Sequence, residues 1–474
     1  MSDRPEAGRS GGPLNSEGKG QPVRRVLVFA IVSLALIMMS VDSTIVATAL
    51  HALQHGLHTS INWAGWTITA YAFGIVLMLP VSGELSERYG ALKVFLISVV
   101  AFTVASLFCG LADNIYLLIA LRAIQAVGGA GFTPSATAII VDRFGDKRDL
   151  AVSLFGSIFS IGAMIGPIFG GLFVSYWSWR GIFFVNVPIG LIVIVLALRF
   201  IPRDPPPERE SRPGIDIIGM AMLGAGLFAA MLPASYLGEK DASVWSPMFL
   251  IPATVAIVLL WAFFHHIHRS ASPFIAPRLI HGPGFGPVNL INGLYGGVSA
   301  GAVALVPLYA INRYGLNALD SGTLLFAEGA AAIVLSLVAA LALRRTGYRA
   351  PMFIGNVIIA VGLLLLARRP PTGISPYMWL AFSAFLLGAG VGAINPASRN
   401  SGLQMEPERS STIAALRSMI MQIGTIAIVT IATAILATSK DPGISQGWIF
   451  LVTALLFVVC MPLVALVPEH RGSW

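Results

Sequence analysis

GAMIGPIFGG, residues 162–171, lies at the centre of an apolar run that extends from residue 151 to residue 176. Pro167 has no N–H group, so the carbonyl of Ala163 loses its helical partner and the helix kinks. In lipid, neighbouring helices and Ser or Thr side chains can satisfy such a carbonyl. A ridge without side chains lets two membrane helices approach closely, and three glycines spaced four residues apart form one here: Gly162, Gly166 and Gly170.

The composition of the whole chain agrees with a membrane protein. Of its 474 residues, 56% are hydrophobic and 11% are charged, whereas soluble domains carry about 25% charged residues. The net charge of +8 does not indicate a nucleic-acid partner, because Lys and Arg gather in the cytoplasmic loops of membrane proteins. Both cysteines, Cys109 and Cys460, lie in apolar runs and are interpreted as buried side chains rather than disulfide partners.

Fourteen apolar runs are each long enough to cross a bilayer core of about 30 Å. An even number of spans places both termini on one side of the membrane. The runs lie at about 26–50, 63–82, 94–112, 115–140, 151–175, 181–201, 216–236, 248–268, 287–311, 321–343, 351–367, 376–398, 412–438 and 447–467.

The basic residues indicate which side is cytoplasmic. With the N-terminus inside, 22 of the 30 Lys and Arg residues fall in cytoplasmic segments, as the positive-inside rule requires. Arg122 and Arg417 lie within spans, and Arg417 is expected to reach the interface. The outer pair Arg368–Arg369 departs from the rule. Seven tryptophans fall at outer span ends, as interfacial residues do: Trp63, Trp66, Trp177, Trp179, Trp245, Trp379 and Trp448.

Two turns of the chain resemble each other and suggest an internal repeat. Aligning Gly90 on Gly347 also pairs Arg88 with Arg345, eight spans later, and such repeats are typical of secondary transporters. The predicted organisation is a disordered cytoplasmic tail (1–25), an N-terminal six-helix half (26–201), a cytoplasmic linker (202–215), two extra helices (216–268), a cytoplasmic connection (269–286), a C-terminal six-helix half (287–467) and a cytoplasmic tail (468–474).

Five motifs occur in a characteristic order: VDSTIVATAL (41–50), GELSERYG (83–90), RAIQAVGGAG (122–131), GAMIGPIFGG (162–171) and WSWRGIFFVNVPIG (177–190). Together they resemble the fourteen-span drug:proton antiporter branch of the major facilitator superfamily. The chain departs from the pattern of that branch at His51, where Pro is usual, at Glu87, where Asp is usual, at Ala126, where Gly is usual, and at Ala91 and Leu92, which replace basic residues.

The resemblance implies an all-α polytopic membrane protein of the major-facilitator type, with two six-helix halves and two extra helices between them. All 14 helices would span the membrane and both termini would be cytoplasmic. Glu87 and Arg88 would form a charge relay that locks the inward-closed face, although a solvated turn is the alternative. Gating or conformational roles are implied for Gly83, Glu87, Arg88, Gly90, Gly162, Gly166, Pro167, Gly170 and Gly171.

The resemblance also implies a role for the opening segment. It would join the two halves, favour the outward-closed arrangement and seal the protein against proton leak. A kinked packing seam between helices is the alternative reading, and the two readings are compatible.

Ionisable residues deep in a span cost at least about 2.5 kcal/mol, so they indicate function. Asp42 lies two-thirds of the way along the first span. A low-dielectric site favours the neutral form of a carboxylate, so we expect Asp42 to exchange protons and to face the central cavity. The polar stripe on the opposite side of its helix, Ser40, Thr44 and Thr48, would then pack against neighbouring helices. A permanent pairing of Asp42 with a donor is the alternative.

Arg122 and Gln125 share one helical face in the fourth span. A guanidinium keeps its proton, so Arg122 cannot carry one but can tune the proton affinity of a nearby carboxylate. A fixed structural ion pair is the alternative. Gln125 is a candidate for the substrate cavity, together with Asp42 and Glu328.

Glu328, in the tenth span, belongs to none of the five motifs. It is interpreted as a second proton site or as a counter-charge for a cationic substrate, with an interfacial or packing role as the alternative. The proton-coupling candidates are therefore Asp42, Arg122 and Glu328.

Other classes of function lack support in the sequence. A phosphate-binding loop of the Gly-x-x-x-x-Gly-Lys-Ser/Thr type is absent, and no nucleophile–base pair suggests an enzyme. His51, His55 and His58 share one face but have no acidic or cysteine partner nearby, so neither a metal site nor a cofactor is predicted, and the proton gradient would supply the energy.

The sequence therefore predicts a multi-pass efflux pump of a bacterial inner membrane that exchanges protons for hydrophobic or amphipathic small molecules, and we expect a monomer. Export of a dedicated lipid or secondary metabolite by the same machinery is the leading alternative. Proton-coupled uptake, or a non-transporting sensor or scaffold, is less well supported.

Overall fold

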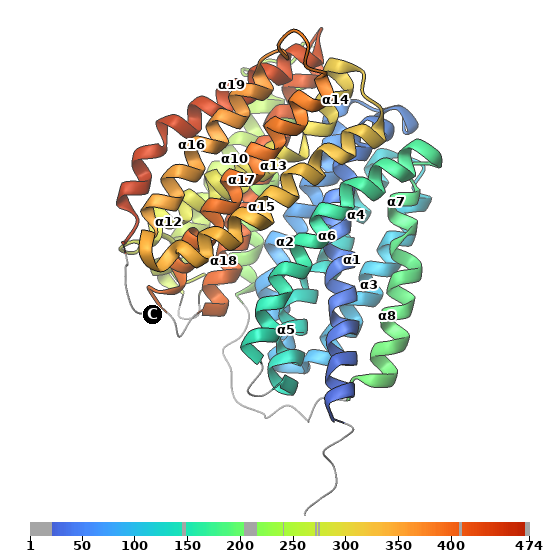
Figure 1. Ribbon diagram of the computed structural model, residues 1–474, viewed down its shortest axis with the longest axis vertical. Coiled ribbons are helices and arrows are strands. Elements are labelled where there is room, and N and C mark those ends of the chain that lie inside the picture. The colour runs from blue at the N-terminus through green and yellow to red at the C-terminus, as the bar shows by residue number, and fades with distance from the viewer. Residues whose placement is uncertain are drawn as a thin grey trace, which may run out of the picture.

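The computed structural model describes residues 21–144, 148–202, 216–239, 241–270, 273, 275–406 and 410–469, and its described elements are all helices (Figure 1). Residues 1–20 of the predicted tail, residues 203–215 of the linker and residues 470–474 lie outside these ranges, whereas residues 21–25, predicted to belong to the disordered tail, form the start of the first helix. The N-terminal half consists of α1 (Gln21–Gly56), α2 (Ile61–Tyr89), α3 (Ala91–Leu111), α4 (Ile115–Ala130), α5 (Phe132–Phe144), α6 (Arg148–Tyr176), α7 (Gly181–Phe184) and α8 (Asn186–Phe200).

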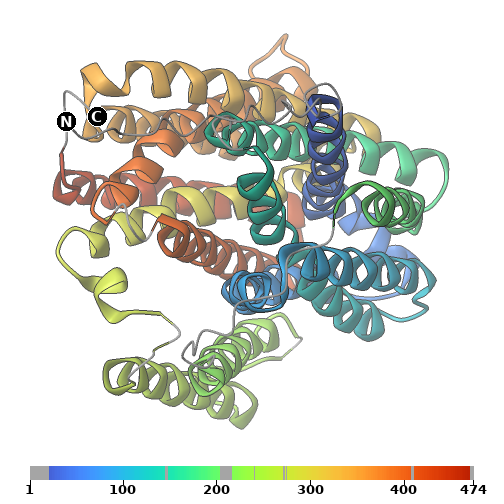
Figure 2. The same ribbon diagram turned by 90° about the horizontal axis from the view of Figure 1, so that it is seen from below.

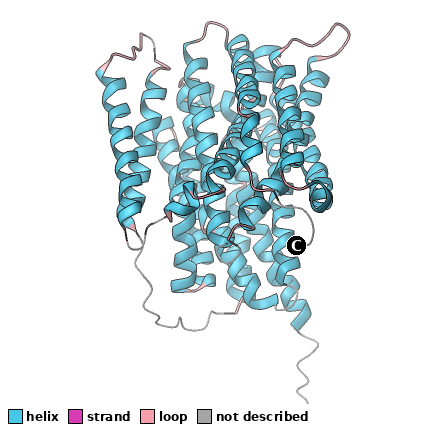
Figure 3. Cartoon of the chain, turned by 90° about the vertical axis from the view of Figure 1, so that its left-hand side faces the viewer, coloured by secondary structure: helices cyan, strands magenta, loops and turns pink. Residues whose placement is uncertain are grey.

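Two further helices stand at one edge of the bundle, α9 (Ile217–Tyr236) and α10 (Pro247–Arg269), and Figure 2 shows them in light green beside the other helices. α9 packs against α2 of the N-terminal half and against α18 (Ser410–Thr438) of the C-terminal half. Figure 3 shows that the described chain is built of helices joined by loops. The pair therefore covers one side of the junction between the two halves.

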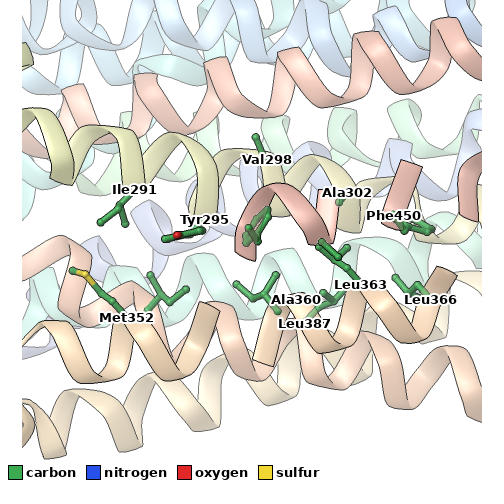
Figure 4. Packing of buried hydrophobic residues seen from close by; sticks show 14 of the residues in the cluster. Ile291, Tyr295, Val298, Ala302, Met352, Ala360, Leu363, Leu366, Leu387 and Phe450 are labelled. Carbon is green, nitrogen blue, oxygen red and sulfur yellow. The ribbon is translucent and has the colours of Figure 1, made fainter. Parts of the chain in front are cut away.

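The C-terminal half follows the short helix α11 (Pro277–His281). Its core contains Tyr295, Leu363, Leu387 and Phe450, which come from four of its spans (Figure 4). Its elements are α12 (Phe285–Ile291), the π-helix η2 (Asn292–Val298), α13 (Ser299–Ala304), α14 (Val306–Tyr314), α15 (Ala318–Thr346), α16 (Arg349–Ala367), α17 (Pro376–Leu403), α18, α19 (Pro442–Val459) and the 3₁₀ helix η4 (Met461–Leu466).

Thirteen helices of the described residues are long and apolar enough to cross a membrane. The fifth predicted span corresponds to α6, whose apolar part within the described side chains, Ile161–Tyr176, is shorter than a full crossing. The structure thus supports a multi-pass membrane protein. The count of fourteen and the cytoplasmic position of the termini stay predictions.

Three predicted spans are interrupted beside a proline. Pro134 has no N–H to offer the carbonyl of Ala130, and the fourth span breaks there into α4 and α5. Pro188 and Pro307 have the same effect, and the breaks fall between α7 and α8 and between α13 and α14. Each proline lies in the first turn of the following helix, where a missing N–H costs little.

The two glycines of the predicted repeat adopt the same kind of turn. Gly90 has a φ of 96° and Gly347 a φ of 72°, values that favour glycine. Gly90 donates its N–H to the carbonyl of Ser86 at 3.1 Å, and Gly347 donates to that of Leu343 at 2.9 Å. The two turns therefore end α2 and α15 in the same way, which supports the alignment of the two halves.

The two halves touch mainly through two helix pairs, α2 with α18 and α6 with α15. At the top of Figure 1 lies the end where α1 ends and α2 begins, called here the tryptophan-bearing end because Trp63, Trp177, Trp179, Trp245 and Trp448 are found there. One apolar cluster joins residues of both halves at this end, including Leu50, Leu308 and Leu436. Two other clusters lie within one half each. A fourth cluster also joins the halves, through α9 and α10, and includes Trp66, Phe263 and Leu416, so their apolar contacts are not confined to the tryptophan-bearing end.

Candidate functional site

Asp42 accepts hydrogen bonds from three side chains that belong to two other helices. Arg122 on α4 donates from Nη1 to Oδ2 of Asp42 at 2.7 Å. Gln125, one turn later, donates from Nε2 to Oδ1 at 2.9 Å, and Asn186 at the start of α8 donates to the same oxygen at 2.8 Å. None of these four side chains is more than 1% exposed. The ionised carboxylate is thus fully paired inside the N-terminal half.

The donors of Asp42 are themselves held by a second set of groups. Arg122 donates from Nε to the backbone carbonyl of Thr67 on α2 at 3.2 Å and lies over the ring of Tyr71 at 4.2 Å. Gln125 accepts from Nη1 of Arg122 at 2.6 Å and contacts the hydroxyl of Ser106 on α3 at 2.6 Å. The network therefore connects α1, α2, α3, α4 and α8. A change in the charge of Asp42 would disturb all five helices.

The sequence predicted Asp42, Arg122 and Gln125 but not their partner Asn186. Asn186 lies in the quoted motif 177–190, but nothing in its spacing points to a carboxylate 144 residues earlier. Because Asp42 and Gln125 are both fully buried, neither lines an open cavity in this conformation. The expectation that they face the central cavity is therefore not met here, since the network is closed by helices of a single half.

Glu328 lies apart from this network. It belongs to α15 in the other half. A Cβ added to Gly388 on α17 would lie 2.9 Å from the Cα of Glu328, so α15 and α17 are in close contact there. Its side chain is half-buried, and within the described ranges it has no ion pair or hydrogen bond. The structure thus separates the three predicted proton-coupling residues into a buried pair and an isolated carboxylate.

The glycine ridge of α6 packs against α1. A Cβ added to Gly162 would lie 2.7 Å from Cβ of Ser40, and one added to Gly166 would lie 2.8 Å from the carbonyl of Val41. The predicted packing of the polar stripe of α1 against a neighbouring helix is confirmed, since Thr44 and Thr48 lie against the same ridge. The three ridge glycines therefore pack within the N-terminal half, to which both helices belong, and the predicted contact with the other half is made by other residues of the same segment.

Another face of the same segment does contact the other half. A Cβ at Gly171 would lie 2.8 Å from the carbonyl of Ala318 on α15. Two glycines of α15, Gly322 and Gly329, lie against Pro167 and Met164 of α6. The close approach between the halves therefore depends on Gly171 of the motif and on small residues of α15, which the motif in α6 does not reveal.

We expect Gly166→Ala to destabilise the protein and to reduce transport. Its methyl group would meet the backbone of α1, and overpacking of this kind costs about 1–3 kcal/mol. Melting of the purified protein and its transport rate would be measured beside Gly286→Ala, because a Cβ at Gly286 has no neighbour closer than 3.9 Å. Equal melting temperatures and rates for the two variants would contradict this packing role.

The predicted gating turn between α2 and α3 is exposed. A Cβ added to Gly83 would have one neighbour within 4 Å among the described residues, the Cβ of Pro134 at 4.0 Å. The exposed side chain of Arg88 lies 5.7 Å from the ring of Tyr89. The side chain of Glu87 lies outside the described part, so the charge relay stays a prediction.

Arg417 forms hydrogen bonds with asparagines of two other elements, and its predicted position at the membrane interface stays a prediction. It donates to Oδ1 of Asn292, the first residue of the π-helix, at 3.2 Å and to Oδ1 of Asn395 on α17 at 2.5 Å. Thr425, further along α18, donates to the carbonyl of Gly297 in the same π-helix at 3.0 Å. These contacts satisfy polar groups beside the irregular helix.

His51 and His55, at the tryptophan-bearing end, line a cavity of about 310 Å³ between the halves, together with Asn312 and Ser439. The Nε2 atoms of His51 and His55 lie 3.2 Å apart. Among the described residues, no group of three or more His, Cys, Asp or Glu side chains is placed to hold a metal ion.

The sequence pattern of the Major Facilitator Superfamily matches residues 32–427 and 288–474. The chain belongs to the major facilitator superfamily. As a member of this family it is a transporter and not an enzyme. The fold agrees: the inward-open xylose transporter XylE from E. coli superposes with a TM-score of 0.62, with 13% sequence identity over 95% of this chain and 98% of that chain.

Several relatives in this superfamily carry names that refer to drug resistance. Multidrug resistance protein 3 of Bacillus subtilis (strain 168) is 27% identical over 87% of this chain and 80% of its own length. The Multidrug resistance protein B homolog of Mycobacterium tuberculosis (strain ATCC 25618 / H37Rv) is 29% identical over 82% of this chain and 72% of its own length. The Tetracenomycin C resistance and export protein of Streptomyces glaucescens is 26% identical over 86% of this chain and 74% of its own length.

Proposed function

We propose that this transporter exports hydrophobic or amphipathic small molecules in exchange for protons, by alternating access. The observation that carries the proposal is the buried carboxylate of Asp42, which faces an arginine in a membrane-spanning bundle. Buried ionisable groups in spans mark proton relays in many transporters. The relatives named for multidrug resistance support export as the direction.

Protonation of Asp42 would break its ion pair with Arg122, because a neutral carboxyl group no longer attracts the guanidinium. Arg122 would keep its contacts with Thr67 and Gln125. The link from α1 to α4 would thus weaken while α4 stays in place. Since α1 packs along the ridge of α6, and α6 contacts α15 of the other half, a shift of α1 reaches the junction between the halves.

The proposal places the protein in a bacterial plasma membrane as a monomer, with its N-terminus and the turn at Arg88 on the cytoplasmic side. Within the fourteen-span branch the tryptophan-bearing end would be the outer end. The apolar cluster of Leu50, Leu308 and Leu436, which joins the halves at that end, would then correspond to an outward-closed state. Glu328 would serve as a counter-charge for cationic substrates or as a second proton site.

The proposal predicts dye accumulation in inside-out vesicles whose lumen is made acidic. A cationic and a neutral amphipathic dye should both accumulate, because protons leaving the lumen would drive export into it. A protonophore should abolish the accumulation of both dyes. Accumulation that continues after the gradient has collapsed would contradict proton coupling.

Export of one dedicated product is the second candidate. The similarity to a protein named for tetracenomycin C resistance and export favours it. A dedicated exporter would accumulate neither test dye in the same vesicles, although its own product would still be moved by the gradient. The vesicle assay therefore separates the two candidates.

A further inference from the structure

A cavity of about 250 Å³ opens on the C-terminal half at the tryptophan-bearing end. It lies between the end of α14, the segment that follows α16 and the start of α19. Its lining includes Arg313, Arg369, Tyr309, Gly443 and Trp448. The cavity is separate from the Asp42 network, which belongs to the other half.

Two arginines face this small space without an acidic partner. Within the described ranges, neither Arg313 nor Arg369 forms an ion pair with Asp or Glu. The nearest acid along α19, Asp441, accepts a hydrogen bond from the N–H of Ile444 at 2.9 Å and so serves as the cap of that helix. Two guanidinium groups in one cavity favour an anion, and phosphate suits their fork-shaped donor geometry.

An apolar path leads away from the cavity along α19. Five large apolar side chains repeat every three or four residues and therefore share one helix face, and each is at least 42% exposed: Ile444, Trp448, Val452, Leu455 and Val459. Trp448 lies at the start of the path beside the arginines, in the position that interfacial tryptophans occupy. Such a surface suits an acyl chain, which a free phosphate ion lacks.

We propose that this cavity binds the phosphate headgroup of an anionic lipid, with one acyl chain along the exposed face of α19. Arg313 and Arg369 would hold the phosphate, and Trp448 would lie at the boundary between headgroup and chain. Gly443 contributes by its small size, because a Cβ there would lie 2.8 Å from Cα of Arg313. The proposal explains why arginines occur at an end that is otherwise poor in basic residues, and it does not depend on proton-coupled export.

The test compares lipid retention by the full-length protein in native mass spectrometry, with phosphatidylglycerol and phosphatidylcholine as probes. Arg313→Gln and Arg369→Gln should each weaken phosphatidylglycerol retention by about tenfold, the loss expected for a charged hydrogen-bond pair. Arg368→Gln is the matched control, because Arg368 is an exposed neighbour that does not line the cavity. The Arg368→Gln variant should retain as much phosphatidylglycerol as the unchanged protein.

A competition experiment with inorganic phosphate tests whether the cavity holds the headgroup of a lipid or a free phosphate ion. Millimolar phosphate should not displace phosphatidylglycerol if the acyl chain contributes to binding, and displacement would overturn the lipid assignment in favour of a free anion. Equal loss in Arg368→Gln and Arg369→Gln would mean that general surface charge, not the cavity, attracts the lipid. Equal retention of phosphatidylcholine would also overturn the proposal.

Discussion

Replacement of Asp42 by Asn is expected to abolish transport driven by a pH gradient. The substitution keeps the size and polarity of the side chain, but it removes the titration. A proton-driven pump must pass through both the protonated and the deprotonated form, so a residue locked in the neutral state stops the cycle. Dye binding to the purified protein should persist, because Asp42 is fully buried in the N-terminal half.

Glu328→Gln is the control that separates the two carboxylates, measured in the same acid-lumen vesicles with the same two dyes. If Glu328 acts as a counter-charge, its loss should weaken export of the cationic dye and leave the neutral dye unaffected. If Glu328 carries the proton, its loss should stop export of both dyes, and Asp42→Asn should reduce dye export only slightly. Full gradient-driven export of both dyes by Asp42→Asn would refute the assignment of Asp42.

Replacement of Arg122 by Gln is expected to destabilise the protein more than any other single change in the network. Removing one partner of a buried ion pair costs about 3–5 kcal/mol, because the remaining charge has no compensation. Melting of the purified protein in detergent measures the loss, and Arg88→Gln, which removes an exposed arginine, should melt almost like the unchanged protein. An Arg122→Gln melting temperature equal to that of Arg88→Gln would contradict the network.

The loss in Arg122→Gln comes from the carboxylate of Asp42, which would stay buried without its cationic partner. The double variant Asp42→Asn/Arg122→Gln carries neither charge and should recover much of the lost stability. These two variants together separate the cost of an unpaired charge from the loss of packing.

Much of the fold was predictable because lipid imposes a simple rule on sequence. Long apolar runs identified the spans, and the pair Gly90 and Gly347 identified equivalent turns, since both need a backbone conformation that favours glycine. The breaks beside Pro134, Pro188 and Pro307 were not predicted. A hydropathy pattern continues through such prolines, although the helix does not.

The site was predictable where a charged residue lies within a span, as Asp42 does, or where its residues share one helix. The spacing of Arg122 and Gln125 places both on one face of α4, and their burial follows from the apolar run around them. Asn186 donates to the same carboxylate from another helix, and that contact depends on tertiary packing. The same reason explains Gly322 and Gly329, which contact α6 across the junction of the halves, and the hydrogen bonds of Arg417 with two asparagines.

The measurement that tests proton coupling through Asp42 most directly is gradient-driven uptake by the double variant Asp42→Asn/Arg122→Gln. The unchanged protein and the variant would be placed in vesicles with an acidic lumen, and dye binding by each purified protein would confirm that both are folded. The account predicts normal binding but no accumulation of either dye by the double variant. Accumulation at the rate of the unchanged protein would show that Asp42 and Arg122 form a structural ion pair and that the proton travels elsewhere.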